Sequence, residues 1–410
     1  MNVIYVTKNL PYGPGEGFIY AEINNHLAAC WNITVVPVRK IRLVHEDGRK
    51  LQGRTWGRGL IDLPILVGFT RELLRNPLLV SRVLLSTLDP RKPKLWLRNM
   101  AVWAKGVWLA RQARRAGVDH IHAHWIAVPA TMALIAARVS GIPFSITAHR
   151  YDIAQGNIIA EKSRYAVFIR AIDQSGAEEI VAQQSAGQTA PQLVRMGVNF
   201  PNTAVDLRAG ALLQMRGIIA ARMVAKKGHE TLFRAIAGAR ANGIDLALDL
   251  FGDGPLEQAL RHLAQDLGIA DLITFGGVLG HEALMQRLGA GVYDVAVLPS
   301  VTARDGDKEG IPVFLMEAMG AGLPVIATPN GGIAELILPN CGLLVPEYDA
   351  AALADAIVRL ARDGSLRNKI ATAGRAQVIE HFDLSSTCAK LRLMMAAPDA
   401  GAKDPVGEGD

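Results

Sequence analysis

The chain of 410 residues has little cysteine, few aromatic residues and no long apolar run. Its three cysteines, Cys30, Cys341 and Cys388, are too few and too scattered for a disulfide framework or a zinc site, which fits a reducing cytoplasm. No apolar run reaches the roughly 18 residues that a membrane-spanning helix needs. The opening MNVIYVTKNLPYG lacks the basic and apolar stretches of a signal peptide. We therefore expect a soluble cytoplasmic protein, or one that lies on the inner surface of the membrane.

Short apolar segments alternate with helical patterns, and this alternation occurs in two successive series. The expected strands are residues 2–7, 33–38, 120–125 and 143–149 in the first series, and 217–223, 246–254, 273–277, 294–300 and 324–328 in the second. Such alternation predicts parallel sheets with crossover helices. Because the chain is also longer than one core usually supports, we predict an α/β fold with two doubly wound, Rossmann-like domains that face each other across a cleft.

The same pattern places the domain boundaries. We predict an N-terminal domain over residues 1–200, a C-terminal domain over 214–383, and a linker near 197–213. A helix is expected over 384–397. The remaining residues, 398–410, are rich in glycine, proline and aspartate, and we expect them to be disordered.

The net charge of +6 is unevenly distributed, and residues 71–115 are strongly basic. Its basic residues are Arg71, Arg75, Arg82, Arg91, Lys92, Lys94, Arg98, Lys105, Arg111, Arg114 and Arg115. Only Glu72 and Asp89 oppose them, and Trp96, Trp103 and Trp108 are interleaved. This composition is typical of a helix at a membrane surface, and equally of a packed helical region with a solvated basic face. Nucleic acid is not an expected partner, because no binding motif accompanies the charge.

Two carboxylates lie eight residues apart in EGIPVFLME, at Glu309 and Glu317. The apolar pattern predicts a helix from Pro312 to Met319, ended by Gly320, because proline is tolerated at the start of a helix. One carboxylate then precedes the helix and the other lies within it, so they are not a close acid/base pair. The backbone N–H groups of Gly310, Ile311 and Val313 would instead suit an anion such as phosphate.

These segments also carry a resemblance to a known family. EGIPVFLME, ARMVAKKGHETL (221–232), LFGDGP (250–255), HIHAHW (120–125) and PFSITAHRYDI (143–153) resemble the motifs of retaining GT-B glycosyltransferases of family 4. Together with GFIYAEI (17–23), they look most like bacterial exopolysaccharide enzymes of the colanic-acid type.

The resemblance implies roles for individual residues. Four would act at the reacting bond: Glu309 on donor-sugar hydroxyls, His149 beside the reacting sugar, and Arg222 and Lys227 on the diphosphate. Fixed cations there would stabilise the charge that builds up on the leaving nucleoside diphosphate. Glu317 would bind the ribose. The other donor-binding positions would be Gly310, Ile311, Pro312, Gly252, Gly254, Gly15 and Gly17.

The implied activity is transfer of a hexose from a nucleotide diphosphate sugar, here a UDP-hexose, to a glycan acceptor. The acceptor would be a lipid-linked intermediate in exopolysaccharide or other cell-surface polysaccharide biosynthesis, reached at the membrane through residues 71–115. No cofactor or metal ion is required. Two alternatives are a GT-B-type nucleotide-sugar epimerase and a non-catalytic sugar-binding protein.

Three patterns could indicate other sites. Asp305 and Asp307 form a D-x-D sequence that can hold a divalent ion, but Arg222 and Lys227 already supply positive charge. GAGLP (320–324) resembles part of a dinucleotide fingerprint, yet it follows a helix instead of a strand. His120, His122 and His124 share one face of a strand. We expect them to pack instead of binding a metal, because no nearby carboxylate or cysteine completes a site.

Overall fold

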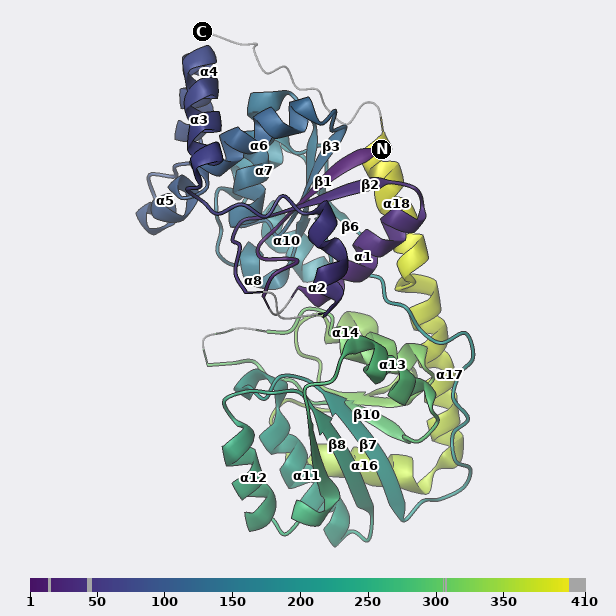
Figure 1. Ribbon diagram of the computed structural model, residues 1–410. Helices are drawn as coiled ribbons and strands as arrows, with labels where there is room; N and C mark the ends of the chain where they lie inside the picture. Colours follow the sequence, from purple (N-terminus) through teal and green to yellow (C-terminus); the bar gives the residue numbers. More distant parts are fainter. Residues whose placement is uncertain (14–15, 43–45, 305, 307, 398–410) are drawn as a thin grey trace. The chain divides into compact units, whose positions relative to one another are not determined.

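The computed structural model describes residues 1–13, 16–42, 46–304, 306 and 308–397. The predicted tail at 398–410, the predicted donor-binding Gly15, and Asp305 and Asp307 lie outside the described residues. The chain divides into two compact units, and each is described by itself (Figure 1). Unit 1 comprises Met1–Arg195 together with the chain from Leu384 onward, and unit 2 comprises Met196–Asp383.

Unit 1 is built on a parallel sheet of six strands in the order β2-β1-β3-β4-β5-β6. The strands are β1 (Asn2–Thr7), β2 (Asn32–Pro37), β3 (His120–His124), β4 (Phe144–Ala148), β5 (Ile169–Ala171) and β6 (Pro191–Leu193). The sequence predicted the first four within two residues at each end. It missed β5 and β6, which are only three residues long and carry an arginine or a glutamine at the centre.

Helices pack on this sheet. They are α1 (Gly17–Ala28), α2 (Glu46–Leu51), α3 (Leu63–Arg75), α4 (Pro77–Leu85), α5 (Pro93–Met100), α6 (Trp103–Arg115), α7 (Val128–Ser140), α8 (Arg150–Ile153), α9 (Ile159–Tyr165), α10 (Gln174–Val181) and α18 (Leu384–Ala396). Proline occupies the first turn of α3, α4 and α5, where its missing N–H leaves no hydrogen bond unmade.

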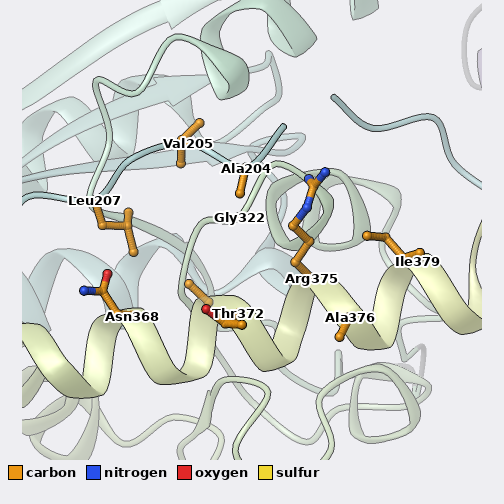
Figure 2. Close-up of a pocket in the computed structure, with 10 residues that line it drawn as sticks. Ala204, Val205, Leu207, Gly322, Asn368, Thr372, Arg375, Ala376 and Ile379 are labelled. Carbon is orange, nitrogen blue, oxygen red and sulfur yellow. The ribbon is translucent and has the colours of Figure 1, made fainter. Parts of the chain in front are cut away.

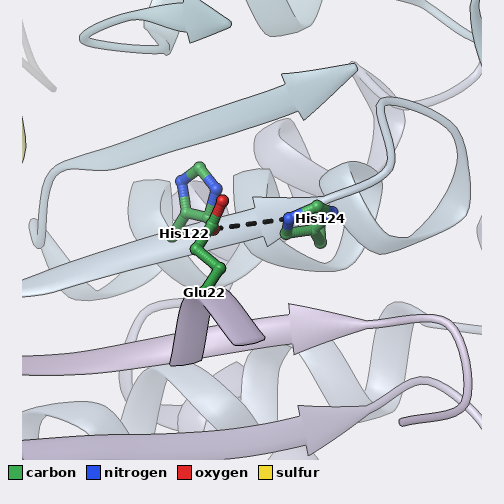
Figure 3. A group of neighbouring side chains, drawn as sticks. All are labelled: Glu22, His122 and His124. Carbon is green, nitrogen blue, oxygen red and sulfur yellow. Dashed lines mark ion pairs between the residues drawn. The ribbon is translucent and has the colours of Figure 1, made fainter. Parts of the chain in front are cut away.

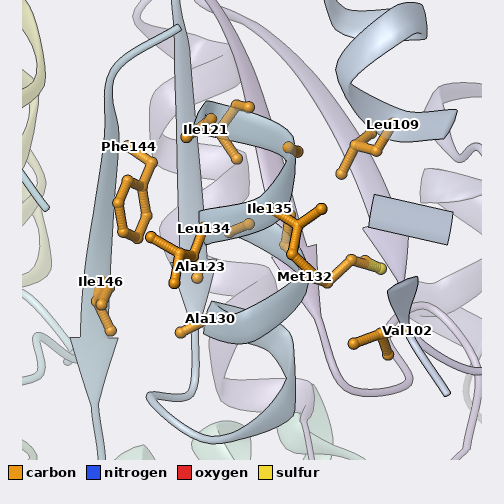
Figure 4. Packing of buried hydrophobic residues seen from close by; sticks show 14 of the residues in the cluster. Val102, Leu109, Ile121, Ala123, Ala130, Met132, Leu134, Ile135, Phe144 and Ile146 are labelled. Carbon is orange, nitrogen blue, oxygen red and sulfur yellow. The ribbon is translucent and has the colours of Figure 1, made fainter. Parts of the chain in front are cut away.

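Successive β1 residues point to opposite faces of the sheet, so each face has its own core. Ile4 and Val6 belong to a cluster in which α7 packs between the sheet and α6, through residues such as Met132 and Leu109 (Figure 4). Val3 and Tyr5 belong to the other cluster. That cluster contains Ile19 and Ile23 of α1 and Leu391 and Met395 of α18, so the last helix completes the core of unit 1.

Unit 2 contains a second parallel sheet of six strands, in the order β12-β11-β10-β7-β8-β9. The strands are β7 (Gln214–Ala220), β8 (Asp245–Phe251), β9 (Ile273–Gly277), β10 (Val295–Leu298), β11 (Val325–Ala327) and β12 (Leu343–Leu344). The chain moves outward from β7 to β8 and β9, and then returns to the other side of β7 with β10. The strand order therefore reverses between β7 and β10, and such a switch point is where open α/β sheets bind ligands.

The helices of unit 2 are α11 (His229–Ala241), α12 (Glu257–Asp266), α13 (His281–Gly289), α14 (Val313–Gly320), α15 (Ile333–Leu336), α16 (Ala350–Arg362) and α17 (Gly364–His381). The predicted helix at 312–319 is α14, with Pro312 as its N-cap residue and Gly320 as its last residue. Two parallel α/β sheets confirm the predicted fold class. In the part of the chain that the structure describes, no helix combines the length and apolar character needed to cross a membrane.

Candidate active site

Two segments meet at the switch point of unit 2, one after β7 and one after β10. Lys227 lies on the first and Glu309 on the second, and the Lys227 ammonium is 2.7 Å from Oε1 of Glu309. The segments are held together by backbone contacts, since Val301 donates its N–H to the carbonyl oxygen of Lys226. Glu309 is buried, and the Ser300 hydroxyl lies 3.3 Å from the same carboxylate oxygen. The structure therefore brings together two of the residues that the sequence placed at the reacting bond.

Arg222 lies on the same segment as Lys227, two residues after the end of β7. Its side chain is exposed, whereas Lys227 is half-buried through its pair with Glu309. The segment that follows β7 thus presents one exposed cation and one cation fixed by a carboxylate. This arrangement can bind a doubly charged anion at the carboxyl end of the sheet.

The glycines predicted to bind donor have a clear steric role. Gly252 and Gly254 have φ values of +136° and +158°. A Cβ atom would lie 2.1 Å from the carbonyl oxygen of Ala221 at the first position and 2.4 Å from that of Met223 at the second. Only glycine therefore lets the loop after β8 approach the loop after β7 this closely. These glycines shape the segment that carries Arg222.

Glu317 has a different partner from Glu309. It lies inside α14, is 2 % exposed, and its Oε1 is 2.7 Å from Nε2 of His281, the first residue of α13. Gly310, Ile311 and Pro312 precede α14, and a Cβ atom on Gly332 would come within 3.1 Å of Gly310 and Ile311 atoms. The two glutamates are thus held separately, one before the helix and one within it. His281 was not singled out from the sequence, and no motif there marks it.

The remaining predicted residues belong to unit 1, where His149 follows β4 and precedes α8. Asp152 fixes the backbone at this point, because its carboxylate accepts hydrogen bonds from the N–H of His149 at 2.8 Å and of Ala127 at 3.2 Å. Burial raises the pKa of Asp152 to about 7, and the backbone hydrogen bonds act in the opposite direction. The His149 ring packs against Trp125 and Phe18, with centroids 4.4 and 5.3 Å away.

The expectation that no carboxylate lies near the histidines of β3 was wrong. Glu22 of α1 lies beside His122 and His124, and Figure 3 shows the three buried side chains facing one another. Nε2 of His124 is 3.4 Å from Oε1 of Glu22, and Nδ1 of His124 is 3.1 Å from Nε2 of His149. The sequence did not suggest this neighbour, because Glu22 and His122 are separated by one hundred residues of chain.

The contacts of this cluster favour a hydrogen-bonded network over a metal site. The Glu22 carboxylate binds Arg170 at 2.7 Å and the Tyr5 hydroxyl at 3.0 Å. Burial acts to raise the pKa of Glu22, but Arg170 and the nearby histidines outweigh it and hold the pKa well below its ordinary value. Both ring nitrogens of His122 contact hydroxyls, those of Ser145 and Thr147. An ion would have to break these bonds, and it would lie next to the Arg170–Glu22 pair.

Glu16 is a functional candidate that the sequence analysis did not identify. Its buried carboxylate accepts three successive backbone N–H groups after β1, those of Lys8, Asn9 and Leu10, at 2.6–3.1 Å. It also accepts the indole N–H of Trp125, after β3, at 2.7 Å. Glu16 therefore joins the two strand ends at which the strand order of unit 1 reverses. Gly17 begins α1 next to it, with open space around its Cα.

A pocket in unit 2 is lined by none of the switch-point residues of that unit. Its lining comes from α17 and from the segment that precedes β7, and it includes Leu207, Thr372 and Ile379 (Figure 2). Arg375 at its edge donates hydrogen bonds to the carbonyl oxygens of Pro201, Asn202 and Gly320. The lining is largely apolar and holds none of the predicted site residues. The pocket therefore adds nothing to the chemistry at the switch point.

The two parallel sheets have the GT-B fold, as their likeness to solved structures shows. The structure is similar to that of HepE from Anabaena in complex with UDP and glucose, with a TM-score of 0.67 and 15% sequence identity, covering 97% of this chain and 99% of that one. A sucrose-phosphate synthase from Thermosynechococcus elongatus gives a TM-score of 0.67 at 19% identity, covering 96% and 98%. At such identities the likeness shows the fold alone.

The sequence of unit 2 is similar to a known family. Residues 217–377 match the family model described as Glycosyl transferases group 1, so this part of the chain is similar to that family. Both Lys227 and Glu309 lie within the matched residues.

Part of the chain is also similar to curated relatives. A putative colanic acid biosynthesis glycosyltransferase, WcaL of Salmonella typhimurium, is 37% identical over 193 residues, which cover 46% of this chain and 47% of that protein. The amylovoran biosynthesis glycosyltransferase AmsK of Erwinia amylovora is 35% identical over 192 residues, 47% of each chain. The chain spans about half the length of the curated relatives that it matches.

Proposed function

We propose that this protein is a retaining glycosyltransferase of the family 4 type, which moves a hexose from a nucleotide diphosphate sugar to a glycan acceptor. The observation that carries the proposal is the Lys227–Glu309 pair, 2.7 Å apart at the switch point of a Glycosyl transferases group 1 domain. The names of the relatives WcaL and AmsK support a role in exopolysaccharide or other cell-surface polysaccharide biosynthesis.

The proposed roles follow the charges of the site. Arg222 and Lys227 bind the diphosphate of the donor and stabilise the negative charge that grows on it as the glycosidic bond breaks. Glu309 accepts hydrogen bonds from the sugar hydroxyls, beside the backbone of Gly310–Pro312, and Glu317 accepts them from the ribose. Since these two cations supply the charge compensation, we propose that no metal ion takes part. Addition of a chelator such as EDTA is then expected to leave the rate unchanged.

Retention of configuration requires that the acceptor attacks the anomeric carbon from the same face from which the leaving group departs. We propose that the departing diphosphate takes the proton of the acceptor hydroxyl on that same face, while Lys227 and Arg222 hold the diphosphate in place. His149, after β4 of unit 1, is proposed to contact the reacting sugar. No enzyme nucleophile is part of this proposal.

The donor is proposed to be a UDP-hexose. UDP is present in the HepE structure, whereas a relative from Mycobacterium tuberculosis, 34% identical over 181 residues, is named as GDP-mannose-dependent. The experiment therefore compares UDP- and GDP-hexoses, each with and without a membrane lipid extract. Nucleoside diphosphate released only in the presence of acceptor supports the proposal. Isomerised sugar without acceptor would establish the epimerase alternative, and binding without turnover would establish a sugar-binding protein.

The acceptor is proposed to be lipid-linked and to be reached at the cytoplasmic face of the membrane. The support is the surface of α3, α4 and α5, where large apolar side chains are exposed among basic ones. The exposed apolar residues are Leu63, Leu66, Val67, Leu74, Leu78, Leu85, Leu97 and Met100. The exposed basic residues of these helices are Arg71, Arg75, Arg82, Lys94 and Arg98. This mixture suits a bilayer that contains anionic lipid.

Part of the predicted basic segment does not belong to that surface. Lys105 is fully buried and donates hydrogen bonds to the carbonyl oxygens of Pro37, Val38 and Arg58. Trp108 is also buried, in the core of unit 1. Sequence composition could not separate these residues from the exposed ones, because α6 carries its buried face inside the same basic segment.

A further inference from the structure

The side chain of Asn330 bonds two residues of the segment that leads from β10 to α14, Thr302 and Glu309. Its Oδ1 accepts the backbone N–H of Glu309 at 2.8 Å, and its Nδ2 donates to the Thr302 hydroxyl at 3.0 Å. Asn330 is 1 % exposed. One buried amide therefore fixes the backbone of Glu309 relative to the start of the segment that carries it.

Glu347 determines which way this amide points. Its Oε1 accepts a hydrogen bond from Nδ2 of Asn330 at 2.8 Å, and its Oε2 accepts the backbone N–H of Thr302 at 2.6 Å. A carboxylate can only accept, so the NH2 group of Asn330 must face Glu347 and its oxygen must face Glu309. Burial acts to raise the pKa of Glu347, but the hydrogen bonds from Thr302 and Asn330 hold the pKa below its ordinary value.

The residues after Asn330 hold the other side of the Glu309 backbone. Gly332 donates its N–H to the carbonyl oxygen of Glu309 at 3.3 Å. Gly331 has a φ of +55°, and a Cβ atom there would lie 1.9 Å from that same oxygen. Both peptide groups of Glu309 are thus fixed by residues 330–332, while its carboxylate remains directed at Lys227.

We propose that Asn330 and Glu347 are positioning residues for the donor sugar, which act by holding the Glu309 carboxylate in place opposite Lys227. This inference rests on the proposed function, because it assumes that Glu309 contacts the sugar of the donor. Neither residue needs to touch substrate. Their loss lets Glu309 move relative to Lys227, so the sugar loses a fixed acceptor while the diphosphate keeps its cations.

The distinguishing measurement is affinity for the complete nucleotide sugar against affinity for the nucleoside diphosphate alone. The purified full chain, with Asn330→Ala or Glu347→Ala, is titrated with UDP-glucose and with UDP by calorimetry, and with the GDP pair if the wild type prefers it. We expect affinity for the sugar nucleotide to fall about tenfold, the effect of losing one hydrogen bond to a charged group. Affinity for the diphosphate is expected to stay unchanged. Glu347→Gln keeps one acceptor oxygen for Asn330 but loses the one that accepts the Thr302 N–H, so its affinity for the sugar nucleotide should lie between those of the wild type and Glu347→Ala.

Two controls separate positioning from general destabilisation. Asp349 lies two residues from Glu347 and caps α16 through the N–H of Ala352, so Asp349→Ala should lower thermal stability without changing either affinity. In a double-mutant cycle, Asn330→Ala should have no further effect on sugar affinity once Glu309 is alanine, because it acts through Glu309. If the Ala variants fail to fold, two smaller changes test the same hydrogen-bond network: the single variant Thr302→Val, and Glu347→Gln combined with Asn330→Ser.

The outcomes distinguish this inference from the proposal beneath it. If Glu309→Ala weakens binding of the sugar nucleotide and the Asn330 and Glu347 variants bind it as the wild type does, the positioning role is wrong and the proposed function stands. If additive effects appear in the cycle, the two residues act independently of Glu309, and the inference is again wrong. A wild-type protein that binds no nucleotide sugar overturns both.

Discussion

At the scale of single residues, the Lys227–Glu309 contact is the feature on which most depends. A half-buried lysine and a buried glutamate are held 2.7 Å apart at the end of two strands. Buried ion pairs contribute little net stability, because the cost of desolvating the two charges offsets their attraction. The stability of unit 2 therefore does not explain the pair. In the proposed function, the same lysine also binds the anionic diphosphate of the donor.

The first prediction concerns this lysine. Lys227→Met should lower kcat for nucleoside diphosphate release by about 10²-fold, because it removes a fixed cation from the developing charge of the leaving group. Release is measured by a coupled diphosphate assay with donor and lipid extract. Arg234→Gln, which removes an exposed cation from α11 in the same unit, is the matched control and should leave the rate unchanged. A Lys227→Met enzyme with wild-type kcat would contradict the assignment.

A second prediction concerns the neighbouring His229, which is 2 % exposed. Burial, and to a smaller extent Lys227, lowers its pKa from 6.5 to about 4. The unfolded chain therefore binds this proton at higher pH than the folded chain does. The stability contributed by the neutral ring is present above pH 6.5 and is lost as the pH falls towards 4, at up to about 1.4 kcal/mol per pH unit.

The measurement is urea unfolding of unit 2 between pH 6.5 and 4. Over this interval, His229→Gln should lower the slope of the unfolding free energy against pH, by an amount that corresponds to about one proton at most. The exposed His262 of α12 provides the control variant, His262→Gln. An unchanged slope in His229→Gln would show that this ring is protonated in the folded protein over the same range.

At the scale of elements, the sequence predicted most strands but misplaced the carboxyl ends of β7 and β8 by three residues, missed β12, and predicted the contacts between distant segments poorly. The roles of Lys227 and Glu309 came from the family resemblance, and their meeting fits the rule that the ends of parallel strands share one edge of the sheet. Glu22 could not be placed beside His122, and Asn330 could not be linked to Glu347, because hydrogen bonds between separate segments leave no periodic signal. The strands β5 and β6 were also missed, since they are short and polar at their centres.

A third prediction belongs to α3 and α4. Leu74 and Leu78 are 78 % and 85 % exposed, and they lie close to Arg71, Arg75 and Arg82 in the chain. Leu74→Ser combined with Leu78→Ser should reduce binding to vesicles of phosphatidylcholine with phosphatidylglycerol by about tenfold or more, because two apolar side chains lose their burial in lipid. Sedimentation with the vesicles measures the bound fraction.

The matched control for that experiment is Leu393→Ser. Leu393 is 74 % exposed and lies on α18 of the same unit, so it has similar exposure on a different helix. Binding should also weaken at high salt and on vesicles of phosphatidylcholine alone, since the arginines act through anionic lipid. Equal binding by the double variant and the wild type would remove α3 and α4 from the membrane contact.

At the scale of the whole molecule, unit 1 is made of two separate stretches of chain. The sequence predicted a helix at 384–397 without assigning it to either domain, and α18 places Leu391 and Met395 in the core that holds Tyr5 and Ile19. The two stretches are joined by hydrogen bonds as well, for example from Arg392 to Asn25 of α1 at 2.8 Å. The end of the chain therefore stabilises its beginning.

The fourth prediction tests this. Leu391 is fully buried, so Leu391→Ala should destabilise unit 1 by about 2–5 kcal/mol and increase hydrogen exchange in β1 and α1. Leu393→Ala, two residues away on the exposed side of α18, should change neither. Exchange is followed by mass spectrometry on peptides from both units. Exchange that rises only within unit 2 would contradict the place of α18 in unit 1.

The way in which the chain enters and leaves unit 2 has a consequence for its synthesis. Val198 and Asp383 form a parallel bridge, and the N–H of Val198 bonds the carbonyl oxygen of Phe382 at 2.8 Å, so the two ends of unit 2 lie side by side. Unit 2 is thus an uninterrupted cassette inserted into unit 1. On a ribosome, the cassette can complete its core as soon as Asp383 has emerged. Unit 1 begins the chain, but it cannot complete its core until α18 has been synthesised.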